Sequence, residues 1–217
     1  MDKLNKMVMK NPSLQYSYKN DPKTKLGVHG MVNDFLCISE CDTNSIVKNA
    51  VINSFIESER LTLSKDKSEV VHIGKTKKCT QSCPKLKIHS DDMKQSTCTK
   101  YLGNCITSEG GHKATVEDRR NKGWGKVAQV KAILQEGPFA SHRVEAGLLL
   151  RRSVLVNSLL FSTDTWSAVT ERDLARMQVV DNALMYSLTG GHSKTPVEFY
   201  FLETGSLMLK HIIYNIT

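Results

Sequence analysis

Apolar and polar residues are arranged differently in the two halves of the chain. Up to position 110 the apolar residues form short runs separated by turn-forming residues, whereas from position 112 they recur every three or four residues almost to the end. The dipeptide Gly110-Gly111 lies between the two patterns. The chain is therefore predicted to be α+β, with a mixed first part followed by an all-α second part.

The first 25 positions show no sustained periodicity. They contain polar clusters such as Asn11-Pro12 and Asn20-Asp21-Pro22, which favour turns over regular elements. We therefore expect residues 1–25 to be a poorly ordered leader with a turn at Pro22. No strand is predicted upstream of Leu26.

Residues 26–111 are predicted to form a domain of short strands around one helix. Apolar runs flank Asn33-Asp34, which predicts a β-hairpin over residues 28–39 with this dipeptide as its turn. A helix follows from a cap at residues 42–44 to about residue 60, with an apolar stripe that begins at Ile46 and Val47. A strand is expected within residues 61–74, and residues 86–89 are expected to pair with residues 99–106.

Residues 112–217 are predicted to form a helical domain. The expected helices span residues 114–136, residues 141–162, residues 170–190 and the residues after 195, and the second is expected to be central because it is apolar on most sides. In the first helix Trp124 lies on the apolar stripe, and Gly123 and Gly125 would permit close packing. Thr170 and Asp173 match a capping box, and Gly190 is a stop signal.

The net charge and the lack of targeting signals restrict the partners and the location. The formal charge is +8 with a sequence pI near 9.2, and the basic excess is spread over both halves, which favours a polyanionic partner. No segment approaches the roughly 20 uncharged residues of a membrane span, and residues 1–10 lack the apolar core of a signal peptide. We expect an intracellular protein, cytoplasmic or nuclear, that is neither secreted nor bound to a membrane.

Three short motifs of the first part occur in the order found in the second half of a polymerase palm. They are Met31-Val32-Asn33-Asp34, then Ser64-Lys65-Asp66-Lys67-Ser68 before the strand at Val70, and then Lys100-Tyr101-Leu102-Gly103-Asn104. Together with the helical second part, they resemble a reverse transcriptase of the non-LTR retrotransposon (LINE) type. The resemblance implies a C-terminal palm over residues 26–111 and a thumb and connection over residues 112–217.

The resemblance assigns roles to residues of each motif. In that family the hairpin turn carries two aspartates that hold Mg²⁺ ions for nucleotidyl transfer, so it implies a catalytic and metal-binding position at Asp34 and a degenerate one at Asn33. Lys67 would be the proton donor to pyrophosphate. Tyr101, Leu102 and Gly103 would grip the primer. The implied partners are an RNA template and a DNA primer.

This chain departs from the family at the metal site. Asn33 offers a neutral amide where the family has a carboxylate, and Mg²⁺ selects anionic oxygen ligands. The acidic residues before the turn are Asp2 and Asp21, and neither lies in an apolar strand that could supply the upstream aspartate of the family. We therefore expect no bound Mg²⁺ and no polymerase activity from this chain by itself. Without the metal pair, Lys67 is expected to be an ordinary solvated lysine.

Basic residues of the predicted first long helix are candidates for binding a phosphate backbone. They are Arg119, Arg120, Lys122 and Lys126, and Trp124 lies among them. The alternative is a solvated helix face whose tryptophan belongs to the core, and core is the preferred reading for Trp124. The sequence leaves both readings of the basic residues open.

The cysteines allow a second hypothesis for a site. Cys37 and Cys41, and Cys79 and Cys83, have a spacing compatible with zinc, with His72 and His89 as further ligands. Against zinc, Cys37 falls within the predicted hairpin strand, where a small apolar side chain suffices. Free thiols are therefore preferred for all six cysteines.

The hairpin at residues 28–39 has a further expected consequence. Because no replacement strand is predicted upstream of it, its edge would be open to pairing with another chain, and self-association through this edge is expected. The most favoured function is a reverse transcriptase fragment without activity of its own. The alternatives are a basic remnant that binds an RNA/DNA duplex and a decayed product without a selected role.

Overall fold

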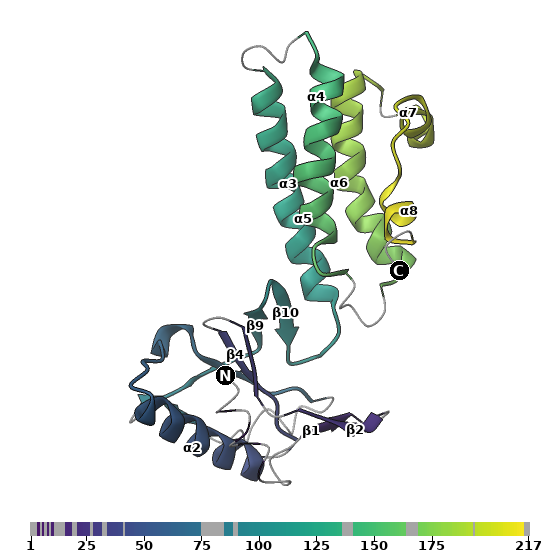
Figure 1. Cartoon of the computed structure of the whole chain (residues 1–217). Coiled ribbons are helices and arrows are strands. Elements are labelled where there is room, and N and C mark those ends of the chain that lie inside the picture. The colour runs from purple at the N-terminus through teal and green to yellow at the C-terminus, as the bar shows by residue number, and fades with distance from the viewer. Residues whose placement is uncertain are drawn as a thin grey trace. The chain divides into compact units, whose positions relative to one another are not determined.

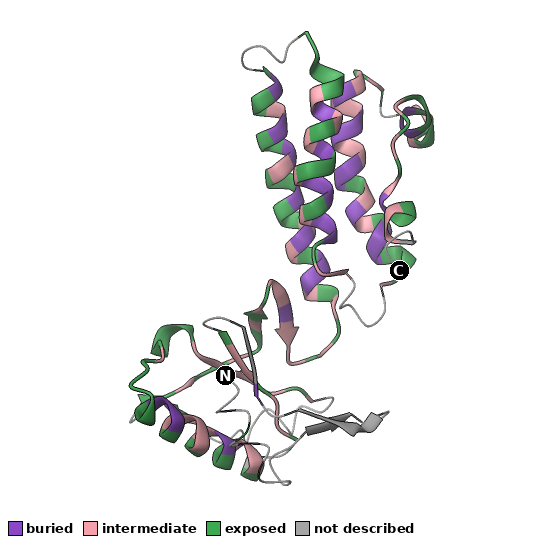
Figure 2. Cartoon of the chain, in the orientation of Figure 1, coloured by how far each residue is buried: buried purple, intermediate pink, exposed green. Residues whose placement is uncertain are grey.

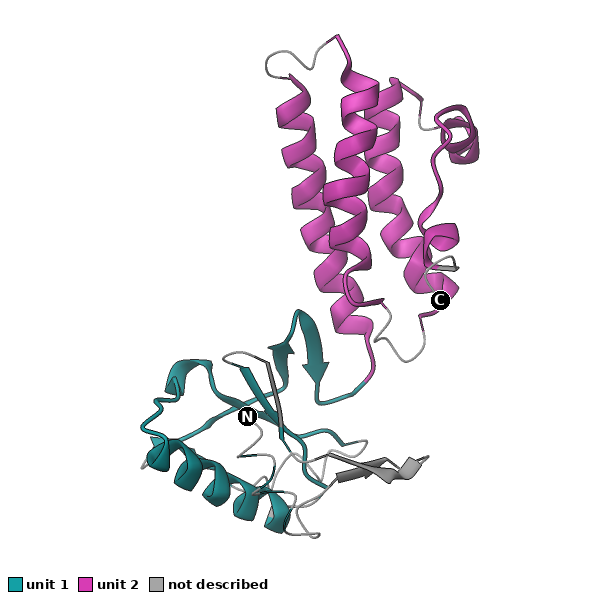
Figure 3. Cartoon of the chain, viewed as in Figure 1, with its two compact units in different colours: residues 1–110 teal, residues 111–217 magenta. Residues whose placement is uncertain are grey.

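The chain is a mixed α and β protein that divides into two compact units, Met1–Gly110 and Gly111–Thr217 (Figure 3). The computed structural model describes residues 4, 6, 8, 10, 16–18, 21–26, 28–31, 34–40, 42–74, 85–88, 91–135, 141–163, 169–192 and 194–214. The division falls at Gly110 and Gly111, which both have positive φ angles, of 73° and 76°. Such angles are easily adopted by glycine, so the paired glycines redirect the chain between the units.

Unit 1 consists of short strand pairs and one long helix, with the labelled strands on one side of the helix (Figure 1). Its elements are β1 (Tyr16–Tyr18), β2 (Asp21–Leu26), β3 (Val28–Met31), β4 (Asp34–Cys37), α2 (Asp42–Ser58), η2 (Lys65–Lys67), β5 (Glu69–Val71), β6 (Lys87–Ile88), β7 (Asp91–Asp92), β8 (Lys94–Ser96), β9 (Cys98–Tyr101) and β10 (Asn104–Thr107). Among the described residues every sheet has two strands: β1–β2, β3–β4, β6–β7 and β9–β10 are antiparallel, and β5–β8 is parallel.

The predicted hairpin at residues 28–39 is confirmed, but its turn is shifted by one position. Met31 pairs with Asp34, so the connection is made by residues 32 and 33, which lie outside the described residues, and Asp34 is the first residue of β4. The predicted helix is confirmed as α2. Its stripe is covered only towards the end, because Ile46 and Val47 are 52% and 39% exposed whereas Phe55 and Ile56 are buried.

Two expectations for the first part are wrong. Residues 1–25 contain β1 and most of β2, with Pro22 inside β2, and the buried side chains of Leu4 and Val8 join the core of unit 1. The signal was weak because the strands are short and flanked by turn-forming residues. The strand pairing of residues 86–89 with 99–106 was also wrong, since β6 pairs with β7 while β9 and β10 form a hairpin of their own. Adjacent segments separated by a short turn pair more readily than distant ones.

Unit 2 is a helical bundle. Its elements are α3 (Lys113–Gln135), α4 (Arg143–Leu150), the π-helical η5 (Arg151–Val156), α5 (Asn157–Leu160), α6 (Glu171–Thr189), α7 (Val197–Glu203) and α8 (Leu209–Tyr214). Figure 2 shows the buried residues of α3, α5 and α6 lining the inner sides of the helices. One core cluster joins α3, η5, α5, α6 and α8.

The structure confirms most helix boundaries of unit 2 but changes its centre. The capping box of Thr170 and Asp173 and the stop at Gly190 are both present. However, α6 packs against α3, α4, η5, α7 and α8, so it occupies the centre that was expected for residues 141–162. Within that segment Leu149 is 69% exposed. A helix that is apolar on most sides is buried only on the sides where other elements pack against it.

The two glycines of α3 differ in their surroundings. A Cβ at Gly123 would lie 2.6 Å from Leu159 Cδ2 and 3.1 Å from Val180 Cγ1, so glycine permits close contact with α5 and α6. At Gly125 a Cβ would meet nothing within 4 Å, and the expectation of close packing is wrong there. None of the helices in the described part of the chain is long and apolar enough to span a membrane.

Candidate functional site

The first candidate site joins two hairpins of unit 1. Asp34 begins β4 and is exposed, and Tyr101 ends β9. Burial raises the pKa of the Tyr101 hydroxyl, and the negative charge of Asp34 raises it further. The Asp34 charge can act on Tyr101 only at short range, because solvent and salt screen exposed charges. Asp34 and Tyr101 are therefore coupled electrostatically within unit 1.

The turn of the second hairpin has an unusual backbone. Tyr101 pairs with Asn104, so Leu102 and Gly103 alone form the turn, and their φ angles are 47° and 81°. Two positive φ angles are typical of a type I′ turn, whose positions favour Asn, Asp or Gly. A leucine in this region costs about 1–2 kcal/mol because its Cβ approaches the following carbonyl. Leu102 is 40% exposed at the tip of the hairpin.

The other residues expected at a catalytic centre are not gathered at Asp34. Asn33 lies outside the described residues. Lys67 is exposed in η2 and, among the described residues, forms no ion pair with Asp34. Among the described residues, no three His, Cys, Asp or Glu side chains lie together in a group that could hold a metal ion.

Most residues of the proposed zinc site lie outside the part of the chain that the structure describes. Cys41, Cys79, Cys83 and His89 lie outside the described residues. Cys37 is a free cysteine at the end of β4; part of its side chain reaches solvent, while its surroundings bury the thiol enough to raise its pKa. His72 follows β5 and is half-buried. The spacing of these residues therefore remains a sequence prediction.

The second candidate site is on α3, and the structure separates its predicted residues. Arg119 is buried, with its guanidinium carbon 4.8 Å from the centre of the Phe161 ring. This position does not suit contact with an extended phosphate backbone, and it corrects the expectation of an exposed arginine. The signal in the sequence was the position of Arg119 between Val116 and Gly123 on the apolar stripe, which indicates burial of its aliphatic stem.

The remaining basic residues of α3 are accessible and lie on two different sides of the helix. Arg120 Nη1 is 3.0 Å from Glu117 Oε1, while Lys122 Nζ is 2.7 Å from Asp118 Oδ2. Lys126 Nζ donates a hydrogen bond to Gln129 Oε1 over 3.1 Å. Trp124 is 40% exposed, so the expectation that it belongs to the core is wrong. Exposed pairs of this kind contribute little stability, so the side chains remain available to a ligand.

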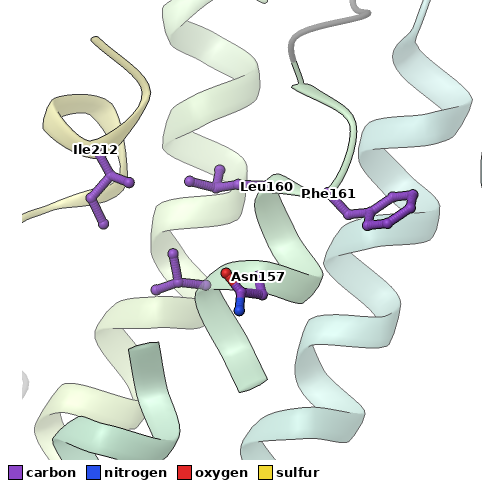
Figure 4. Close-up of a pocket in the computed structure, with 5 residues that line it drawn as sticks. Asn157, Leu160, Phe161 and Ile212 are labelled. Atoms are coloured by element: carbon purple, nitrogen blue, oxygen red, sulfur yellow. The ribbon is translucent and has the colours of Figure 1, made fainter. Parts of the chain in front are cut away.

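A cavity of about 400 Å³ lies between α5 and α8 of unit 2. Its lining residues are Val156, Asn157, Leu160, Phe161 and Ile212. Figure 4 shows the Phe161 ring turned towards α3, in agreement with its contact with Arg119. Asn157 is the polar residue of the lining, and its amide nitrogen donates to Ser153 O over 2.9 Å. The lining residues have no titratable side chain, so they offer no acid, base or nucleophile.

Two buried ionic contacts hold unit 2 together rather than form a reactive centre. Arg151 binds Asp181 through two hydrogen bonds of 2.6 and 2.7 Å and also donates to Leu207 O over 2.8 Å. At the start of α6, burial opposes ionisation of Asp173, but hydrogen bonds from Thr170 and His112 outweigh it and lower the pKa of the Asp173 carboxyl. Each carboxylate is used by partners within the fold.

The comparisons with known proteins give no further information on the site. The chain matches no family model, no curated protein and no solved structure.

Proposed function

We propose that the chain corresponds to the C-terminal part of the palm and the adjoining thumb and connection of a non-LTR retrotransposon reverse transcriptase. In this proposal it has no polymerase activity of its own and binds nucleic acid through both units. The RNA template and the DNA primer are the proposed partners. The element order is compatible with this proposal, because a unit of short strands and one long helix is followed by a helical bundle.

The observations that support the proposal are the order of the motifs along the chain and the electrostatic effect of Asp34 on Tyr101. The two residues belong to two motifs that are far apart in the sequence, and the charge of one acts on the hydroxyl of the other. A palm needs this arrangement, because the catalytic turn and the primer-gripping hairpin act on the same primer end. The strained Leu102 supports it further, since such backbone strain is often found at functional positions.

Loss of polymerase activity follows from the ligands at the hairpin. Asp34 supplies one carboxylate and Asn33 supplies a neutral amide, whereas a two-metal site needs several anionic oxygens to hold both ions. Purified chain should not extend a primer on an RNA template with Mg²⁺ or Mn²⁺. Asn33→Asp should not restore extension, because one further carboxylate does not complete the site. Extension by either protein would contradict this part of the proposal.

Nucleic-acid binding is tested with a labelled RNA/DNA hybrid at several salt concentrations. We expect sub-micromolar affinity at low salt and a log–log slope of several units, as for a protein that neutralises several phosphates. Weak association without a salt slope would favour the alternative of a decayed product. Binding without any contribution from Leu102 would favour the second candidate, a basic remnant that binds through the helical unit alone.

A variant of the strained turn separates binding from folding. Leu102→Gly relieves the positive φ angle of a non-glycine residue and should leave the stability unchanged or raise it by up to about 1 kcal/mol. It also removes the exposed side chain at the hairpin tip, and we expect weaker binding of the hybrid. Leu61→Gly is the control, because Leu61 is 47% exposed in the same unit. Equal binding by the wild type and Leu102→Gly would remove the hairpin from the binding site.

A further inference from the structure

The helical unit has an exposed face on which α3 and α6 lie side by side. A Cβ on Gly123 would lie 3.1 Å from Val180, and His112 Nε2 is 3.1 Å from Asp173 Oδ2, so the two helices start together and run in the same direction (Figure 1). The α3-facing side of α6 therefore includes Asp173 and Val180. Arg172 and Val179, each one position earlier, lie on the shoulder of α6 that faces solvent next to α3.

The matching shoulder of α3 contains the exposed tryptophan. The residues buried on α3 include Val116, Gly123, Val127 and Leu134, which are spaced as one stripe. Arg120 and Trp124 are four positions apart, and Lys113 and Lys131 lie seven positions before Arg120 and seven after Trp124, so these side chains share one side of the stripe. This is the α6 side, because Arg119, on the opposite edge of the stripe, contacts Phe161 after α5.

Basic side chains surround Trp124 on this face, which we call the α3–α6 face. Among the described residues they are Lys113, Arg120 and Lys131 of α3 and Arg172 and Arg176 of α6. Arg120 pairs with Glu117 at the outer rim, and Arg176 Nη1 is 4.0 Å from the largely buried Asp173. The basic side chains outnumber these acidic partners. The other side of α3 has Lys122 and Lys126, and the exposed aromatic ring on that side, Phe161, contacts the guanidinium of Arg119.

We infer that the α3–α6 face binds a single-stranded nucleic-acid segment, with the Trp124 indole stacked on an unpaired base and the basic residues on the flanking phosphates. Trp124 is 40% exposed and lies among cationic side chains. This arrangement suits a single strand, whose unpaired bases are free to stack on the indole, whereas the bases of a duplex are already stacked on each other. The inference rests on the proposed nucleic-acid binding and specifies which face and which form of nucleic acid are used.

The test is the anisotropy of a labelled, unstructured single-stranded oligonucleotide, with a blunt RNA/DNA hybrid measured in parallel. Trp124→Ala should weaken single-strand binding about tenfold, and Trp124→Phe, which keeps an aromatic ring, should restore most of it. Replacing Arg120 and Lys131 by Gln should lower the salt slope by about 1.4 units, since each phosphate contact contributes roughly 0.7 for a single strand. Lys122→Gln with Lys126→Gln is the matched control on the other side of α3 and should change binding little.

The outcomes distinguish the inference from the proposed function. An unchanged single-strand affinity in Trp124→Ala, or equal losses in the Gln variants of both sides, would overturn the inference. So would a loss of hybrid binding that equals the loss of single-strand binding. In a third outcome, hybrid binding depends on Leu102, but the variants of the α3–α6 face bind both ligands like the wild type. The proposed function would then hold, and the α3–α6 face would not be part of the binding site. Absence of binding to either ligand would overturn both. Helical circular dichroism of each variant confirms that the fold is kept.

Discussion

The two units of the chain differ in how their elements are stabilised. In unit 2 the helices close their backbone hydrogen bonds internally and share one core cluster across α3, η5, α5, α6 and α8. In unit 1 the described strands form sheets of two strands each, and the main core cluster consists of Leu4, Val8, Val28, Phe55 and Ile56. Isolated strand pairs are only marginally stable in water. The comparison shows that one shared core joins most helices of unit 2, whereas the described core of unit 1 is smaller and its strands are paired only two by two.

The largest expected difference is in the resistance of the two units to proteolysis. Unit 1 should be cleaved first and leave a fragment that begins near residue 111, because open strand edges and a small core permit local unfolding. Limited proteolysis followed by mass spectrometry measures this. A resistant fragment of residues 26–110 with a degraded helical unit would reverse the comparison.

The next effect is the loss of the buried ion pair of unit 2. Arg151→Met leaves Asp181 buried without its cation, and we expect a loss of about 3–5 kcal/mol in the free energy of unfolding. The side chains of this pair are 5% and 0% exposed, so solvent cannot replace the partner. Urea unfolding followed by helical circular dichroism measures the loss.

The neighbouring exposed arginine provides the control. Arg152→Met should change the stability by less than about 0.5 kcal/mol. Arg151→Met combined with Asp181→Leu should recover part of the loss, because both charges are then removed from the core. Equal effects of the Arg151 and Arg152 variants would show that the pair does not stabilise the bundle.

A smaller effect is expected from the two glycines of α3. Gly123→Ala inserts a methyl group 2.6 Å from Leu159, and we expect a net loss of about 1–2 kcal/mol after the gain in helix propensity. Gly125→Ala meets nothing within 4 Å and should stabilise the helix by up to about 1 kcal/mol. The sign of the difference in melting temperature is the measurement. Stabilisation by both substitutions would mean that the contact of α3 with α5 and α6 is looser than described.

The smallest expected effect is a change in the acid sensitivity of unit 2. The pKa of Asp173 is lowered in the fold, so its ionised form contributes stability above the ordinary carboxyl pKa, and this contribution is lost as the pH falls through the folded value. Asp173→Asn should therefore lower the stability at pH 7 and make it less dependent on pH between about 5 and 3. Melting temperatures across this range test the prediction. A parallel pH profile in the two proteins would exclude this carboxylate as a source of the dependence.

The sequence predicted the helical unit well and the strand-rich unit in part. Residues such as Val127, Val130 and Leu134 have a regular spacing and are buried, so periodicity located α3 within a residue. Strands such as β6 and β7 are too short for a periodicity of two to be detected. Their pairing depends on which strands lie next to them in the folded unit, and the sequence pattern does not specify this. Trp124 was misplaced because a stripe of apolar residues at helical spacing can extend past the contact it makes with other helices.

The candidate site was predicted as a set of residues rather than as a geometry. The order of the motifs containing Asp34 and Tyr101 predicts a shared site, whereas the electrostatic coupling of the two residues depends on how their hairpins fold. The basic face around Trp124 was missed because Arg172 and Arg176 come from another helix, and no spacing rule connects them to α3. Arg119 was expected at the surface because charged residues are rarely buried, and its stacking on Phe161 explains the exception.

The buried arginine has a consequence for the rate at which unit 2 folds and unfolds. Its guanidinium joins residues 151, 181 and 207, which are widely separated along the chain, so the contact requires the closure of two long loops. Contacts of this kind are expected to form after the transition state for folding, when α3 and α6 have already met. Breaking the pair should then accelerate unfolding and leave the folding rate nearly unchanged. The Arg151 contacts would therefore slow the unfolding of unit 2 and so prolong the lifetime of the folded bundle.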